Sequence, residues 1–119
     1  MPSGGKLGRE GTNTRTAIAH PTTRDLEWAA GFLEGEGSFR QDGNSTIVRA
    51  SQVHKPPVIR LLKMFGGRLV QYKYGKAQPA WHWCTSGKRA RGIAMTLYPL
   101  MSPKRQQQIK KALNVRRSK

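Results

Sequence analysis

Residues 28–39 read WAAGFLEGEGSF, and this stretch decides how the rest of the sequence is interpreted. It contains two of only six acidic residues in a chain of 119 residues that has 22 Lys and Arg and a formal net charge of +16. Glu34 and Glu36 fall at the predicted C-terminal end of a helix, where the partial negative charge of the helix dipole disfavours carboxylates. Acids in such a place indicate a role other than helix stability.

The helix that leads to these acids is expected to begin at Thr22 or Thr23, either of which can cap it, with acidic residues in its favourable first turn. Trp28 and Phe32 lie off its main apolar stripe, so we expect a helix that is apolar nearly all round and buried. The residues of that stripe are Leu26, Ala29, Ala30 and Leu33.

Two glycines give this helix a small-residue face. Gly31 and Gly35 are four residues apart, which lets another backbone approach closely. If two copies of the chain pair about a two-fold axis through this face, their Glu36 carboxylates lie side by side. Carboxylates that close repel each other unless a cation lies between them, and hard oxygen ligands beside phosphate suit Mg²⁺. Such ions near a phosphodiester can activate water and stabilise the leaving oxygen.

Strand and helix signals alternate after this stretch. One β-hairpin is predicted from residues 38–41 and 46–53, and a second from residues 68–74 and 80–86, each around turn-forming residues. A helix between the hairpins is expected to open at Pro56 and Pro57 and to end at Gly66 or Gly67. Its apolar stripe is Val58, Leu61, Leu62 and Phe65.

Two further helices are predicted near the end of the chain. Ser86 can cap the first, which Pro99 stops, and Ser102 and Pro103 can start the second. Their inward residues, by the helical period, are Ala90, Ile93, Ala94 and Leu97 in the first and Ile109, Ala112 and Leu113 in the second.

The order of these elements predicts the fold class. It is α+β, with the order α-β-β-α-β-β-α and helices on one face of a curved four-stranded antiparallel sheet whose other face is left free. Residues 1–21 are expected to be a flexible basic arm, residues 22–116 a single domain, and residues 117–119 a basic tail.

Composition restricts the class of partner. A charge this high favours a polyanion, most often nucleic acid. No long apolar run predicts a membrane span, and no apolar segment near the first residue resembles a signal peptide. The single cysteine, Cys84, excludes an internal disulfide, so we expect an intracellular protein of a reducing compartment, not a secreted one.

Residues 29–37, AAGFLEGEG, resemble the signature of the LAGLIDADG homing endonucleases, and the predicted order of elements is also that of this family, over residues 23–115. The first position is Ala29 where the family usually has Leu, and both acids are Glu where it most often has Asp. The resemblance implies a single-motif chain that acts as a homodimer. It implies an intron-encoded enzyme of a mobile element that cuts both strands of DNA at a long pseudo-palindromic site, with Mg²⁺, or Mn²⁺ as a substitute.

The resemblance also implies roles for individual residues. Glu36 binds the catalytic metal together with the backbone carbonyl of Gly35, and Glu34 supports them. Gln52, at the end of the second strand, and Lys104, before the last helix, join Glu36 as catalytic residues. The motif helices pack against each other at the two-fold axis, through Gly31 and Ala30 with Glu34 beside them.

Strand alternation divides the hairpin residues between core and DNA. Phe39 and Trp83 are expected in the core, and a second use of Trp81 and Trp83, stacking on single-stranded bases, is the weaker alternative. The residues expected to face DNA, where Arg and Gln can read base edges, are Ser38, Arg40, Arg49, Gln71, Lys73 and His82.

Three other functions stay open at this point. The chain could be a maturase that binds intron RNA on the same fold, or a non-catalytic DNA-binding protein such as a repressor. It could also be a ribosomal-type basic protein, which predicts a monomer and gives no reason for the acidic pair.

Overall fold

The computed structural model describes residues 14–15, 21–73, 75–76 and 78–113 of the chain. The elements in chain order are β1 (Thr14–Arg15), α1 (Thr23–Glu36), β2 (Gly37–Asp42), β3 (Ser45–Gln52), α2 (Lys55–Phe65), β4 (Gly67–Tyr72), β5 (Ala80–Ser86), α3 (Gly87–Leu97), the 3₁₀ turn η2 (Tyr98–Leu100) and α4 (Pro103–Leu113).

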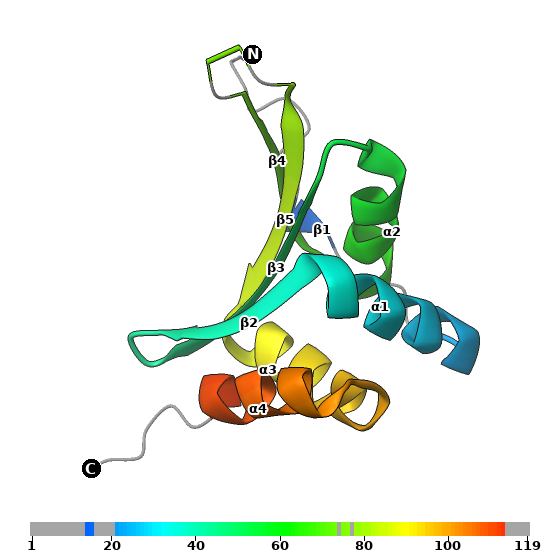
Figure 1. Ribbon diagram of the computed structural model, residues 1–119, viewed down its shortest axis with the longest axis vertical. Coiled ribbons are helices and arrows are strands. Elements are labelled where there is room, and N and C mark those ends of the chain that lie inside the picture. The colour runs from blue at the N-terminus through cyan, green and yellow to red at the C-terminus, as the bar shows by residue number, and fades with distance from the viewer. Residues whose placement is uncertain (1–13, 16–20, 74, 77, 114–119) are drawn as a thin grey trace.

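One curved antiparallel sheet has the strand order β1-β4-β5-β3-β2, and all four helices lie on one side of it (Figure 1). The predicted α+β class and order of elements are therefore confirmed. The short edge strand β1 was not predicted: it lies within the expected basic arm, with Thr14 opposite Arg68 and Arg15 opposite Gly67. The remainder of that arm up to residue 20, and the tail at 117–119, lie outside the described residues.

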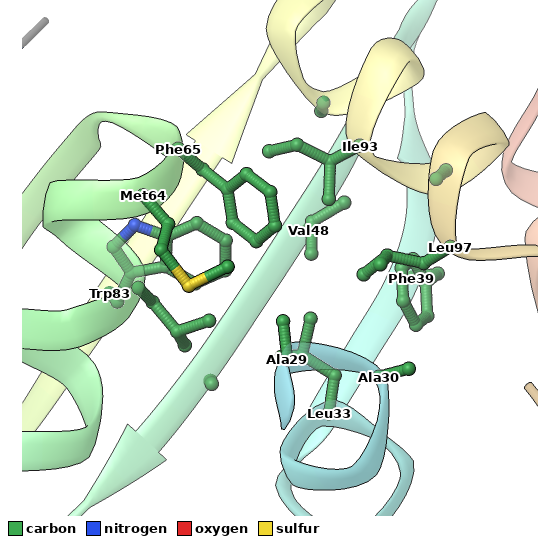
Figure 2. Packing of buried hydrophobic residues seen from close by; sticks show 14 of the residues in the cluster. Ala29, Ala30, Leu33, Phe39, Val48, Met64, Phe65, Trp83, Ile93 and Leu97 are labelled. Atoms are coloured by element: carbon green, nitrogen blue, oxygen red, sulfur yellow. The ribbon is translucent and has the colours of Figure 1, made fainter. Parts of the chain in front are cut away.

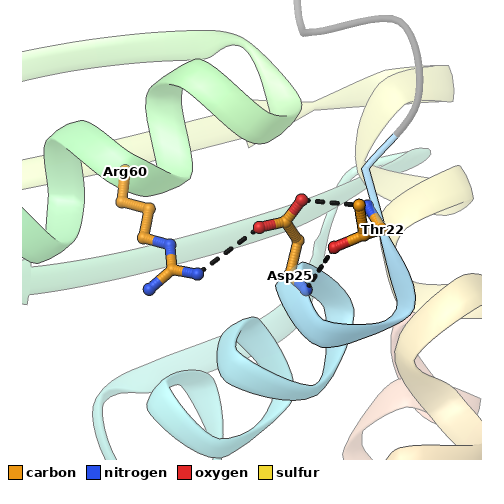
Figure 3. Close-up of polar contacts among 3 residues, drawn as sticks. All are labelled: Thr22, Asp25 and Arg60. Atoms are coloured by element: carbon orange, nitrogen blue, oxygen red, sulfur yellow. Dashed lines mark hydrogen bonds and ion pairs between the residues drawn. The ribbon is translucent and has the colours of Figure 1, made fainter.

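The N-terminal end of α1 is fixed by a capping box that also reaches α2 (Figure 3). The Thr22 hydroxyl accepts a hydrogen bond from the Asp25 N–H at 3.0 Å, and the Asp25 carboxylate accepts one from the Thr22 N–H at 2.9 Å. The second oxygen of Asp25 lies 3.4 Å from the Arg60 guanidinium on α2, which covers the Trp28 ring at 4.1 Å. These contacts hold α1 beside α2.

The core lies between the sheet and the helices (Figure 2). Trp83 of β5 is fully buried beside Met64 and Phe65 of α2, and its ring N–H donates to the Gly66 carbonyl at 2.8 Å, so the one polar atom of the ring has a partner. Trp81 and Trp83 therefore pack in the core, where they cannot stack on nucleic-acid bases. The helix stripes predicted from the period are also buried, namely Val58, Leu61, Leu62 and Phe65 on α2, Ala90, Ile93, Ala94 and Leu97 on α3, and Ile109 and Ala112 on α4.

The expectation that α1 is buried nearly all round was wrong for the single chain. Trp28 and Phe32 stack on each other with ring centroids 5.4 Å apart and are only partly buried, while Gly31 and Gly35 are exposed. Ala30 is 3% exposed inside the core of its own chain. Its side chain is therefore not available to a second copy, which corrects its assignment to an interface.

One predicted cap also has a different partner. Ser86 occupies the N-cap position of α3, but its side chain makes no capping hydrogen bond. The hydroxyl of Ser45, at the start of β3, accepts from the Gly87 N–H at 3.1 Å instead. The start of α3 is thus held by the neighbouring strand.

Candidate nuclease site

The end of α1 leads directly into β2, and Glu36 lies at that junction. Gly37 follows it in extended conformation and donates its N–H to the Leu33 carbonyl, which closes the helix. Glu36 is exposed, and within the described part of the chain no hydrogen bond or ion pair involves its carboxylate. This carboxylate is therefore accessible to a ligand from outside the chain.

Glu34, two residues earlier, is held by α4. The Ser102 N–H donates to one oxygen of its carboxylate at 3.0 Å, and the Ser102 hydroxyl donates to the other at 2.6 Å. These hydrogen bonds hold the pKa of Glu34 below its ordinary value, and the charges of Arg105 and Lys104 act in the same direction. Both oxygens have partners within the chain, so the Glu34 carboxylate joins the end of α1 to the start of α4.

Arg105 contacts the backbone at the same point. Its Nε and Nη2 atoms donate to the carbonyl oxygen of Glu34 at 3.0 and 2.9 Å. The last carbonyls of a helix have no partner within the helix, and here the guanidinium supplies one. This role of Arg105 was not predicted, because no periodic pattern in the sequence marks a side chain that binds a backbone group 71 positions away.

The other two predicted catalytic residues lie on different elements. Gln52 ends β3, two residues past Ala50, which pairs with Gly37, so Gln52 lies on the α1 side of that pairing. Lys104 is exposed in the first turn of α4, and its charge acts on Glu34. The structure thus brings Lys104 and Glu34 together, whereas no described contact joins Gln52 to either acid.

Two oxygen atoms at the end of α1 could serve as part of the ligand set of a divalent cation. With the Leu33 and Glu34 carbonyls occupied by Gly37 and Arg105, the next carbonyl in the chain, that of Gly35, has no donor among the described residues. It lies next to the Glu36 carboxylate, and both are hard oxygen ligands of the kind Mg²⁺ takes. No group of three or more His, Cys, Asp and Glu suited to a metal exists among the residues that the structure describes.

The face of the sheet that the helices leave uncovered is basic; we refer to it as the open face. Cross-strand partners share a face of a sheet, and the register pairs Ser38 with Arg49 and both Arg49 and Arg68 with Cys84. By this register the residues of the open face are Ser38, Arg40, Asp42, Ser45, Ile47, Arg49, Ser51, Arg68, Val70, Tyr72, Ala80, His82, Cys84 and Ser86, with three Arg and one Asp among them. Ser38, Arg40, Arg49 and His82 thus lie on the face expected for them.

The face expected for Gln71 was wrong. Gln71 pairs with the buried Trp81, so it lies on the helix side of the sheet, and Lys73 lies beyond the end of β4. The sequence misled because Leu69 and Val70 are adjacent apolar residues, so either could face inward. Leu69 is the inward one, and Val70, with Tyr72, lies on the open face.

His82 is the centre of a small polar cluster on the open face. Its Nδ1 lies 2.7 Å from the Ser51 hydroxyl, and the Tyr72 ring meets the imidazole edge-on at 4.8 Å. Burial lowers the pKa of His82, and the Arg49 charge lowers it further, so the neutral imidazole is favoured. Its other ring nitrogen, Nε2, is buried without a described partner, so His82 serves the packing of the open face and its ring nitrogens are not exposed to a base edge.

Solved structures of homing endonucleases are similar to this chain. I-CvuI in complex with its target in the presence of 2 mM Ca aligns with a TM-score of 0.61 and 18% identity, over 78% of this chain and 68% of its own. The same protein with the I-CreI target in 2 mM Mg, with the DNA not cleaved, aligns at 0.58 and 16% over the same shares. I-CeuI, a group I intron-encoded homing endonuclease complexed with DNA, aligns at 0.50 and 17%, over 79% of this chain and 54% of its own.

These likenesses confirm the fold that the AAGFLEGEG motif indicated: the chain has the LAGLIDADG homing-endonuclease fold. No protein-family model and no curated protein matches the sequence. Among the described residues, none of the helices has the length and apolar character needed to cross a membrane.

Proposed function

We propose that this chain is a site-specific double-strand DNA endonuclease that acts as a homodimer with Mg²⁺. The observation that carries the proposal is the exposed Glu36 carboxylate at the junction of α1 with the sheet of a strongly basic domain. The likeness to solved homing endonucleases bound to DNA supports the same assignment.

Pairing of two chains is supported by the bare face of α1. A Cβ added at Gly31 or at Gly35 meets no atom within 4 Å, so this face has room for another backbone. A two-fold axis through it brings two copies of Glu36 together, with the Gly35 carbonyl of each chain. In such a pair, the Glu36 carboxylate and Gly35 carbonyl of each chain would lie near the axis.

The proposed site combines two oxygen ligands with two polar side chains. Glu36 and the Gly35 carbonyl would hold the cation, which when bound lowers the pKa of water and stabilises charge on phosphate oxygens. Gln52 orients water near the scissile phosphate, and the Lys104 ammonium offsets negative charge on it. Both side chains are polar groups with no described contact that would prevent these roles.

DNA binding is assigned to the open face. Arg40, Arg49 and Arg68 are exposed there and lie on three different strands. A curved antiparallel sheet can enter the major groove, where Arg reads guanine and Ser can read other base edges. The cut then falls where the ends of the two α1 helices meet the DNA.

The test is cleavage of a randomised duplex DNA library with Mg²⁺, with Ca²⁺ as the non-cutting comparison. We expect wild type to cut defined sites and Glu36→Gln to bind the same sites in Ca²⁺ without cutting them. Glu27→Gln is the matched control, because it removes the same charge from an exposed position on the same helix. It should cut as wild type does.

Other outcomes redirect the assignment. Cleavage by Glu36→Gln at the wild-type rate contradicts the metal-ligand role. Specific DNA binding without cutting by any variant favours a repressor. Specific binding of structured intron RNA, with splicing help that survives Glu36→Gln, favours a maturase.

A further inference from the structure

The contacts between the end of α1 and the start of α4 form a closed ring, which we call the α1–α4 clamp and define as Glu34, Ser102 and Arg105. The Ser102 hydroxyl donates to the Glu34 carboxylate and accepts from the Arg105 N–H at 3.2 Å. The Arg105 guanidinium returns to the Glu34 carbonyl through two donors. Ser102, directly before α4, and Arg105, in its first turn, thus bind both the side chain and the backbone of Glu34.

The guanidinium itself is prevented from rotating. Its Nη1 donates to the Gln108 side-chain oxygen at 2.8 Å, while Nε and Nη2 point at the Glu34 carbonyl. A planar fork held by three hydrogen bonds fixes direction as well as distance, which a lysine ammonium does not. The carbonyl it holds belongs to the peptide bond that joins Glu34 to Gly35.

The clamp residues are neighbours in sequence of the residues proposed to act in DNA cleavage. Gly35 and Glu36 directly follow the held peptide, and Lys104 lies between Ser102 and Arg105 on α4. Gly35 has no side chain to fix its orientation, and an added Cβ there would touch nothing within 4 Å. The clamp is the described contact that orients this segment from the α4 side.

We propose that Arg105, acting through this clamp, is a positioning residue that aims the Gly35 carbonyl and the Glu36 carboxylate at a divalent cation and sets Lys104 beside them. This inference rests on the proposed function. Residues that orient metal ligands from outside typically change metal affinity or activity by about 10- to 100-fold when removed. A loss of that size separates positioning from a contact that only stabilises the fold.

Arg91 provides a matched control at the other end of α4. Its Nη1 donates to the Leu113 carbonyl at 3.0 Å, so Arg91 also binds a backbone carbonyl of a helix end. Arg91 lies on α3, and among the described residues no hydrogen bond joins it to Glu34, Ser102 or Arg105. Arg91→Lys and Arg105→Lys thus keep the charge and break the same kind of contact at two places.

The experiment is a Mn²⁺ titration of the free protein, followed by paramagnetic broadening of backbone amide signals. We expect the Glu36 amide to broaden first in wild type, and Arg105→Lys to need about tenfold more Mn²⁺ for the same broadening. Arg91→Lys should match wild type. Ser102→Ala, which keeps the Ser102 N–H to Glu34, is the milder clamp variant and should shift the titration in the same direction by less.

Two outcomes overturn the inference in different ways. If Arg105→Lys and Ser102→Ala both titrate as wild type does, the clamp only stabilises the fold, and the proposed nuclease function is untouched. If wild type itself shows no broadening at Glu36, the metal assignment of the proposed function fails, and the positioning role fails with it. Cleavage rates of the same variants at saturating DNA should follow the titration, with Mg²⁺ dependence changed only by the clamp variants.

Discussion

The two sides of the C-terminal half of α1 differ in what they touch. On the side of α4, Glu34 alone accepts four hydrogen bonds, two from Ser102 and two from Arg105. Elsewhere on the helix surface, Gly31 and Gly35 expose backbone, and we call this surface the bare side. Glu36 lies about 160° around the helix from Glu34, and its carboxylate has no partner in the described part of the chain.

Two acids only two positions apart thus have different functions in this chain. Glu34 stabilises the N-terminal end of α4, where a carboxylate interacts favourably with the helix dipole, so its charge serves the fold. Glu36 has no such compensation at the C-terminal end of its own helix, where its charge is unfavourable. A residue such as Glu36, whose charge lowers the stability of the fold and makes no stabilising contact, is expected at a functional site.

The largest effect is expected from a side chain placed on the bare side. Gly31→Gln should prevent pairing of two chains and therefore abolish double-strand cleavage, because the added side chain occupies the space of the second backbone. Gly92→Gln on α3 is the control, since Gly92 is also exposed in a helix with nothing within 4 Å of an added Cβ. Both changes replace a helical glycine and should raise the stability of the single chain by up to about 1 kcal/mol.

Sedimentation equilibrium and thermal melting separate these two effects. We expect a dimer for wild type and Gly92→Gln, and a folded monomer for Gly31→Gln. A dimer of unchanged affinity for Gly31→Gln would show that the glycines of α1 do not form the interface. The exposure of Gly31 and Gly35 would then have a cause other than pairing of two chains.

A smaller effect is expected from removing each acid in turn. Glu34→Gln should lower the free energy of unfolding by about 1 kcal/mol, because a charged acceptor at a helix start becomes neutral while remaining partly exposed to water. Glu36→Gln should not lower it. Urea unfolding at one fixed protein concentration measures both, since the stability of a dimer depends on concentration. Equal losses for the two variants would contradict the division of function between the acids.

Much of this arrangement could be predicted from the sequence where a local pattern determined it. The stripe Val58, Leu61, Leu62 and Phe65 follows the helical period, and these residues are buried as expected. The turn at Gly43 follows from a residue type that readily adopts positive φ, and its φ is 63°. Acids at a helix end were visible as an anomaly because the helix dipole disfavours them there.

The remainder depends on contacts between distant segments, which leave no periodic signal. Ser102 was predicted as a helix start, but its bonds to Glu34 could not be predicted, because the packing of α4 against α1 decides them. The face of Gln71 depends on where β4 begins. That start is set at Gly67, with φ 109°, where an added Cβ would lie 2.7 Å from the Cys84 carbonyl. The two-residue pairing of β1 is too short to show any pattern.

The smallest effect, and the most specific to one side of α1, is the pH dependence of the Glu34 contribution. The pKa of Glu34 is lowered in the folded chain by the Ser102 hydrogen bonds, so its contribution is fully present above the ordinary glutamate pKa. It is lost as pH falls through the lowered pKa, because protonation removes the charged acceptor. The difference in stability between wild type and Glu34→Gln should therefore stay constant near neutral pH and shrink as pH falls below the ordinary glutamate pKa of 4.5.

The pKa of Asp25 is also lowered, by its hydrogen bonds to Thr22 and by Arg60, but it titrates alike in both proteins and cancels in the difference. Ser102→Ala supplies the control, because it removes the hydroxyl that contributes most to the Glu34 shift. In that background Glu34→Gln should cost less at neutral pH and vary less with pH. Urea midpoints across a series of pH values measure this. A difference that stays constant to acid pH would mean that Glu34 acts through shape alone, and the contrast with Glu36 would then rest on the dimer and cleavage measurements.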